Sequence, residues 1–186
     1  MDLRSLLTGL IAWGLYPLWL AAGAVDYFCH RRTDIEHTSG FTESRLHVAQ
    51  FACIGLIGAL GVLAQITIAV WTVLLLAVVA HSALAYVDVS YTQSRRLISP
   101  LEQVAHNYLE VLPLVFVALL GVIHWPLERA PWLALREGIG WGEALLLGSL
   151  AVLAGAPVFE ELMRTSRVRE TAPATARLSH DGGRAS

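Results

Sequence analysis

Long apolar stretches recur along this chain, and they constrain its fold more than any other feature. Apolar side chains make up 55% of the residues and charged side chains only 15%, whereas a water-soluble domain of this length carries more charge. A helix needs about 20 apolar residues to cross the hydrocarbon core of a bilayer. We expect transmembrane helices at about 5–25, 47–64, 66–88, 108–124 and 142–158. The sequence therefore predicts an all-α fold, an integral-membrane helical bundle of about five transmembrane helices.

The chain contains no lysine, and its 13 arginines predict how the bundle is oriented. With five crossings, ten arginines fall on one side of the membrane and three on the other. The richer side holds the loops at 26–47 and 89–106 and the C-terminal stretch, and the positive-inside rule assigns it to the cytoplasm. We expect a protein of the inner (plasma) membrane with its N-terminus outside and its C-terminus in the cytoplasm. Residues 1–163 should form a single transmembrane domain and 164–186, which are polar, a disordered cytoplasmic tail.

Acidic residues and histidines cluster near the ends of the predicted helices. Three acid–histidine pairs have the spacing acid-x-x-x-His, namely Asp26 with His30, Glu43 with His47, and Glu102 with His106. Positions i and i+4 share one face of a helix, so each pair could present two ligands to the same ion. His81 and Asp88, at the end of the third predicted helix, add a fourth pair. Taken singly, each pair is better explained by an interfacial histidine and a glutamate that favours a helix start.

The orientation predicted from arginines brings all four pairs to the cytoplasmic ends of the helices. Ionisable groups are costly in or beside a membrane span, so their convergence indicates a function. Four imidazoles and four carboxylates could fill the coordination spheres of two metal ions. Mixed ligation of this kind fits iron, manganese or zinc, and we favour two irons because di-iron helical bundles combine inward carboxylates with histidines. His37, in a loop on the same side, is a further candidate ligand.

In this arrangement, over about residues 20–110, the chain resembles the membrane histidine-box proteins, which include fatty-acid hydroxylases, desaturases and alkane monooxygenases. Those proteins place histidine clusters at the cytoplasmic ends of four helices around two irons. The segments DYFCH, ESRLH and EQVAH carry the resemblance, with Asp26, Glu43 and Glu102 standing where the family has the first histidine of a box. The resemblance implies an oxygen-dependent oxidoreductase of the hydroxylase or desaturase kind.

The leading functional hypothesis is therefore a membrane di-metal oxidoreductase that acts on a lipid or hydrophobic substrate. One alternative is a zinc-dependent membrane hydrolase, in which a metal-bound water attacks a lipid ester, amide or phosphate. Glu36 and Glu110 are the candidate catalytic bases for that reaction. A second alternative is a non-enzymatic metal-binding subunit of a membrane complex.

The sequence also bears on partners. A membrane lipid or another hydrophobic substrate is expected, with an electron donor and a homo-oligomer as open alternatives. Transport across the membrane is disfavoured because the outer halves of the predicted helices are almost free of charge. No glycine-rich phosphate loop, no Ser/His/Asp nucleophile order and no nucleic-acid-binding surface is visible, so we expect no nucleic-acid partner.

Overall fold

The computed structural model describes residues 2–129 and 132–171, and within these ranges the chain is almost entirely helical. In chain order the helices are α1 (Leu3–Leu10), η1 (Ile11–Leu15), α2 (Tyr16–Arg32), η2 (Ile35–His37), α3 (Gly40–Leu63), α4 (Ile68–Thr92), α5 (Pro100–Ile123), α6 (Trp141–Ser149), η3 (Leu150–Gly155) and α7 (Ala156–Thr171). The runs α1–η1–α2 and α6–η3–α7 are each continuous, so five helices in all are long and apolar enough to cross a membrane. The all-α fold with five membrane-length helices is confirmed.

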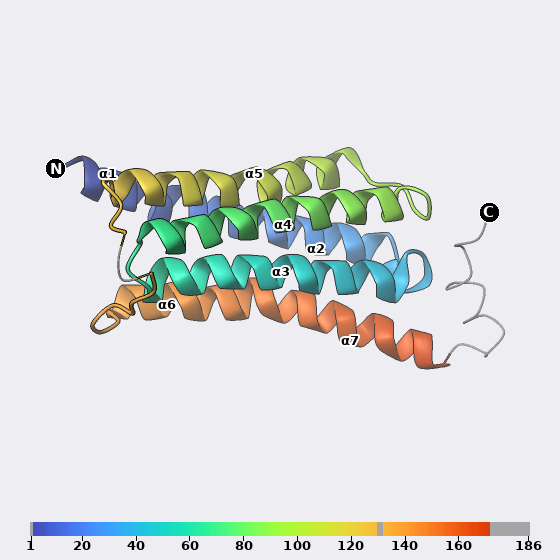
Figure 1. Cartoon of the computed structure of the whole chain (residues 1–186). Coiled ribbons are helices and arrows are strands. Elements are labelled where there is room, and N and C mark those ends of the chain that lie inside the picture. The colour runs from blue at the N-terminus through green and yellow to red at the C-terminus, as the bar shows by residue number, and fades with distance from the viewer. Residues whose placement is uncertain (1, 130–131, 172–186) are drawn as a thin grey trace.

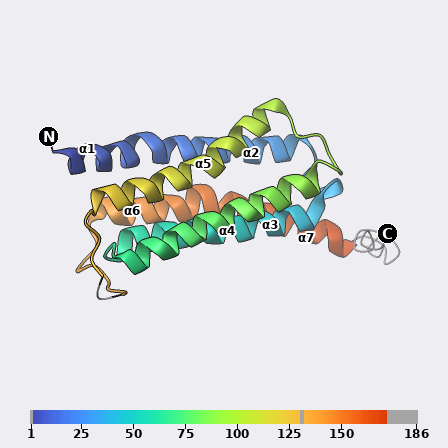
Figure 2. The ribbon, with the colours of Figure 1, turned by 45° about the horizontal axis from the view of Figure 1, so that its top comes forward.

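The five long helices lie side by side in one elongated bundle (Figures 1 and 2). α3 packs against α4 and α7, and α2 packs against α5. Apolar side chains such as Trp19, Leu74 and Val117 fill the space between the helices. Gly58 permits close packing, because a Cβ at this position would lie 2.6 Å from the Leu150 side chain. A small residue at this position therefore allows α3 and η3 to approach closely.

The helices extend further than the apolar runs predict. α2 continues to Arg32, α5 begins at Pro100, and α7 ends at Thr171 rather than near residue 158. Residues 164–171, the first part of the predicted disordered tail, instead continue α7, and Thr165 Oγ1 there donates to Ser44 Oγ of α3 at 3.1 Å. Residues 172–186, the rest of that predicted tail, lie outside the described residues.

The connections divide the bundle into two chemically different ends. One end, here called the arginine-rich end, contains the 33–39 loop, the 93–99 loop and the end of α7 (Figure 1). The opposite end contains α1, the 64–67 turn and the segment that follows α5 (Figure 1). Asp34, with a φ of 53°, and Gly40, with a φ of 66°, turn the chain between α2 and α3. The acid–histidine pairs lie on the parts of α2, α3, α4 and α5 that are nearer to these two loops, and so toward the arginine-rich end.

Candidate metal centre

Nine ionisable side chains meet inside the bundle near its arginine-rich end, and we call them the ionisable cluster. They are Asp26 and His30 of α2, Glu43 and His47 of α3, Asp88 of α4, Arg96 of the 93–99 loop, Glu102 and His106 of α5, and Glu161 of α7. Four of them expose 2% or less of their surface, namely His30, Glu43, Glu102 and Glu161. Burying such groups is costly unless each is compensated by partners or by an ion.

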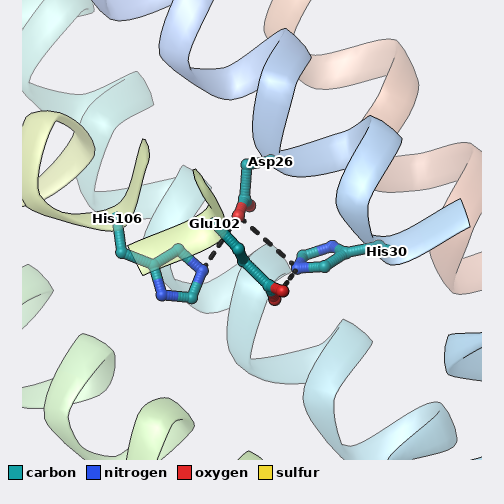
Figure 3. A group of neighbouring side chains, drawn as sticks. All are labelled: Asp26, His30, Glu102 and His106. Atoms are coloured by element: carbon teal, nitrogen blue, oxygen red, sulfur yellow. Dashed lines mark ion pairs between the residues drawn. The ribbon is translucent and has the colours of Figure 1, made fainter. Parts of the chain in front are cut away.

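His30 occupies the middle of the cluster. Its Nε2 atom lies 3.6 Å from Asp26 Oδ1, 3.7 Å from Glu43 Oε1 and 3.5 Å from Glu102 Oε1. This nitrogen is buried and has no hydrogen-bond partner among the described residues. Figure 3 shows Asp26 and Glu102 directed toward the ring, with His106 on the far side of Asp26. A ring nitrogen that faces three carboxylates without bonding to any of them is arranged as a metal ligand would be.

Two groups of donor atoms are close enough to share an ion. The first is formed by Asp26, His30, Glu102 and His106, and the second by His30, Glu43 and His47, with all donor atoms of each group within 4.8 Å of one another. In the first group the His106 Nε2 atom lies 2.9 Å from Asp26 Oδ1. Ligands about 2.1 Å from one ion lie about 3.0 Å apart in an octahedron and about 3.4 Å apart in a tetrahedron. The 2.9 Å separation of His106 Nε2 and Asp26 Oδ1 is near the octahedral value, and the separations of 3.5 to 3.7 Å around His30 Nε2 are somewhat longer than the tetrahedral value.

His30 belongs to both groups, but one imidazole nitrogen has a single lone pair and can bind only one ion. His47 Nε2 has another partner in Asp88 Oδ2, at 3.1 Å. Glu43 Oε1 lies between the two rings, 3.7 Å from His30 Nε2 and 3.9 Å from His47 Nε2. The donors therefore divide into one set around His30 and one around His47, with Glu43 where a shared carboxylate would be.

Glu161 forms a hydrogen bond with each of these two histidines, on the side of the ring away from the other carboxylates. Its two oxygens accept hydrogen bonds from His30 Nδ1 at 2.9 Å and from His47 Nδ1 at 2.8 Å. The rings stack at 4.7 Å with only 2° between their planes. Because a carboxylate only accepts, both Nδ1 atoms carry a proton, and their Nε2 atoms face the cluster; a carboxylate behind the imidazole is how metal-binding histidines are usually held. The acid–histidine spacing does not identify Glu161, because no histidine lies four residues away from it. The sequence feature that could have identified Glu161 is the Glu160–Glu161 pair directly after an apolar run.

Arg96 supplies a buried positive charge at the edge of the cluster. Its Nη2 atom donates to Glu43 Oε1 at 2.5 Å and to Glu102 Oε1 at 2.6 Å. Burial alone would lower the pKa of Arg96, but the hydrogen bonds to Glu102 and Glu43 outweigh burial and raise it, so the guanidinium stays charged. The other oxygen of Glu102 accepts from the Ser99 backbone N–H and caps α5. Glu102 thus combines a structural role at the helix start with a place in the cluster.

The formal charges of the cluster do not cancel without further cations. Five carboxylates face one guanidinium, which leaves four negative charges when the three imidazoles are neutral and one when all three are protonated. Two divalent ions would balance the charge of the neutral-imidazole form. The donor set, imidazole nitrogen with carboxylate oxygen, suits iron, manganese or zinc.

Two predicted residues lie away from the cluster on the 33–39 loop side. His37 is exposed, and its Nδ1 pairs with Asp34 Oδ1 at 2.9 Å, a bond that raises the pKa of His37. Ile35 of η2 is buried against the bundle, whereas the His37 side chain on the same short helix is exposed, so the structure does not bring His37 to the other candidate ligands. Glu36, a candidate base, forms an ion pair with Arg164 of α7 instead.

His81 and Glu110 lie further from the arginine-rich end than the ionisable cluster, His81 on α4 before Asp88 and Glu110 on α5 after His106. His81 is buried, and its Nδ1 atom lies 3.3 Å from the Gln50 carbonyl oxygen, outside both groups of donor atoms. Glu110 is exposed on α5 and lines, with His81, a cavity of about 230 Å³ that also borders His106. Neither side chain is therefore placed as a direct ligand in this geometry.

Comparisons with known proteins add no family to this description. No protein-family model matches the chain. No curated protein and no solved structure is similar enough to match it. The chain is thus defined by its own fold and site, as a helical bundle of membrane-length helices around a buried histidine–carboxylate cluster that fits a metal centre.

Proposed function

We propose that this protein is an integral-membrane metalloenzyme with a di-metal centre, preferably di-iron, and that it catalyses an oxygen-dependent oxidation of a lipid or hydrophobic substrate. The observation that carries the proposal is His30, whose Nε2 faces three carboxylates while Glu161 accepts from its Nδ1. A protonated histidine in a simple ion-pair network would place its Nε2–H on one carboxylate at about 2.7–2.9 Å. The separations of 3.5 to 3.7 Å leave room for an ion instead.

The donors divide naturally between two ions. Seven side chains would be ligands, with Asp26, His30, Glu102 and His106 around one ion and Glu43, His47 and Asp88 around the other. A tetrahedral zinc site takes four ligands, whereas two ions of higher coordination number use this larger set. When bound, a pair of irons would supply the electrons and the oxygen-binding positions for oxidation. Glu161 orients the imidazoles, and Arg96 offsets the excess carboxylate charge.

A cavity beside the cluster supports a hydrophobic substrate. Its volume is about 110 Å³, and it borders Asp26, His30 and His47. The rest of its wall is largely apolar and includes Phe51 and Leu153. A hydrocarbon group would be accepted there, next to the proposed ions.

Oxygen uptake tests the proposed reaction. Purified protein that is reduced with dithionite, freed of excess reductant and mixed with air-saturated buffer should consume oxygen, because the centre would return to its oxidised state. An oxygen electrode measures the uptake, and the His30→Ala protein, treated in the same way, sets the background. Stoichiometric zinc with no oxygen uptake above that background would replace this proposal with the membrane-hydrolase alternative.

We also propose that the arginine-rich end faces the cytoplasm. Among the described residues, eight arginines lie toward that end and three toward the other, and positive charge is retained on the cytoplasmic side. A reporter fused after residue 171 should then be active on the cytoplasmic side, and one inserted at residue 66 on the outer side. The reverse result would overturn this orientation without affecting the metal centre.

A further inference from the structure

A second cavity lies at the opposite end of the bundle from the ionisable cluster. Its volume is about 410 Å³, and the first long helix, α3, α5 and α6 form its walls. Side chains such as Ile57, Phe116 and Leu150 make this lining mostly apolar. Water is poorly held in an apolar space, so a hydrocarbon chain is the occupant that suits the walls.

The Tyr16 hydroxyl inside this cavity is already paired. It forms hydrogen bonds with Ser149 Oγ at 2.8 Å and with the Leu146 carbonyl oxygen at 3.2 Å. Trp19 Nε1, from a residue at the inner end of the cavity, is buried and has no hydrogen-bond partner among the described residues. The walls between the mouth and Trp19 are mostly apolar.

The mouth carries basic side chains. Arg4, His124 and Arg136 line it together with Glu143, whose Oε1 lies 2.7 Å from Arg136 Nη1. The pKa of His124 is lowered, first by burial and then by the positive charges of Arg4 and Arg136. Glu143 pairs with Arg136, and Asp2, two residues before Arg4, accepts a hydrogen bond from the Ser5 backbone N–H. No carboxylate of the described residues forms an ion pair with Arg4, so its guanidinium is available to an anionic group.

The length of the cavity matches one leaflet. It follows the first long helix from Arg4 to Trp19, which is about 22 Å of helix at 1.5 Å per residue. Half of a bilayer, including its headgroup region, is about 20–22 Å thick. A lipid with its head at Arg4 would therefore end its chain near Trp19.

We propose that this cavity binds a single-chain anionic lipid, with the acidic head at Arg4 and Arg136 and the hydrocarbon chain running inward to Trp19. Both a fatty-acid carboxylate and the phosphate of a lysophospholipid have this chemistry. Trp19 and Ile54 also line the cavity beside the ionisable cluster, so the end of the chain would approach the proposed metal centre. The lipid site itself stands whether or not the centre holds metal.

Binding of radiolabelled palmitate to the purified protein, in micelles of a neutral detergent, tests this proposal. Saturable binding of palmitate is expected, with cetyl alcohol at least about tenfold weaker as a competitor, because it lacks the charge that strengthens a hydrogen bond to arginine. Lysophosphatidate is the second competitor: stronger displacement than by unlabelled palmitate identifies a phosphate head, and weaker displacement a carboxylate head. Equal competition by palmitate and cetyl alcohol would overturn the proposal.

Three variants locate the site. Arg4→Gln should weaken palmitate binding about tenfold, and Ala12→Phe should reduce it by filling the cavity that Ala12 lines. Arg129→Gln is the matched control, because Arg129 is exposed near the same end but does not line the cavity. Equal effects of Arg4→Gln and Arg129→Gln, or undiminished binding by Ala12→Phe, would contradict the proposed site. Metal content, measured on the same samples, should stay at the wild-type level, which separates this test from that of the metal centre.

Discussion

Replacing His30 with alanine should remove nearly all bound metal from the purified protein. The His30 Nε2 atom belongs to both groups of donor atoms, and its Nδ1 is one of the two partners that fix Glu161. Alanine would remove the central ligand and leave the carboxylates around it uncompensated, so we expect the neighbouring ion to be lost as well. Metal per chain, measured by inductively coupled plasma mass spectrometry after dialysis, gives the result directly.

The metal content of two further variants is compared with that of the His30→Ala protein. His37→Ala is the matched control, because His37 is exposed and pairs only with Asp34, and it should retain the wild-type metal content. Glu161→Gln should retain the ligands but weaken metal binding by about 10–100-fold, because the amide no longer accepts equally from both imidazoles. Full metal retention by the His30→Ala protein would show that His30 is not a ligand.

The second large effect is expected on stability. Arg96→Met should lower the free energy of unfolding by about 3–5 kcal/mol, because it leaves two buried glutamates facing one another without their shared cation. The Arg96, Glu43 and Glu102 side chains are each no more than 2% exposed, so water cannot replace the guanidinium. Unfolding in mixed micelles with increasing dodecyl sulfate, followed by circular dichroism, measures the difference from wild type.

The neighbouring arginine provides the comparison for that measurement. Arg95 is exposed and lies over the Tyr91 ring, with its Cζ atom 3.6 Å from the ring centroid. Arg95→Met should therefore change stability only slightly. If both variants unfold at the same dodecyl sulfate concentration, the buried contacts of Arg96 do not stabilise the fold as described.

The helical bundle was predictable because its main determinant is local. Apolar runs of bilayer length specify membrane helices wherever they fall in the chain, and all five predicted spans correspond to long helices. The ends were less predictable. α2 extends through Asp26 to Arg32, and α7 extends through Glu161 to Thr171. Asp26 and Glu161 pair with side chains of other helices, whereas the last turns carry exposed arginines such as Arg32 and Arg167. A hydropathy pattern stops at such residues, whereas tertiary pairing lets the helix continue.

The candidate site was predictable in part for the same reason. The i, i+4 spacing and the alternation of helix ends bring Asp26, His30, Glu43, His47, Glu102 and His106 together. Other members depend on contacts that spacing does not encode. Glu161 joins through the packing of α7 on α3, and Arg96 through the fold of the 93–99 loop. His37 is exposed on η2 and pairs with Asp34, and the Nδ1 atom of His81 faces the Gln50 carbonyl oxygen, so neither histidine joins the cluster.

Metal analysis of the wild-type protein tests the central claim most directly. The chain should be purified without chelators and dialysed, and its metals counted per chain by inductively coupled plasma mass spectrometry. The di-metal proposal predicts about two ions per chain, with iron as the main metal. Absence of stoichiometric metal after purification and after reconstitution with iron, manganese or zinc would contradict it. The cluster would then be a network of protonated histidines and carboxylates that holds the helices together.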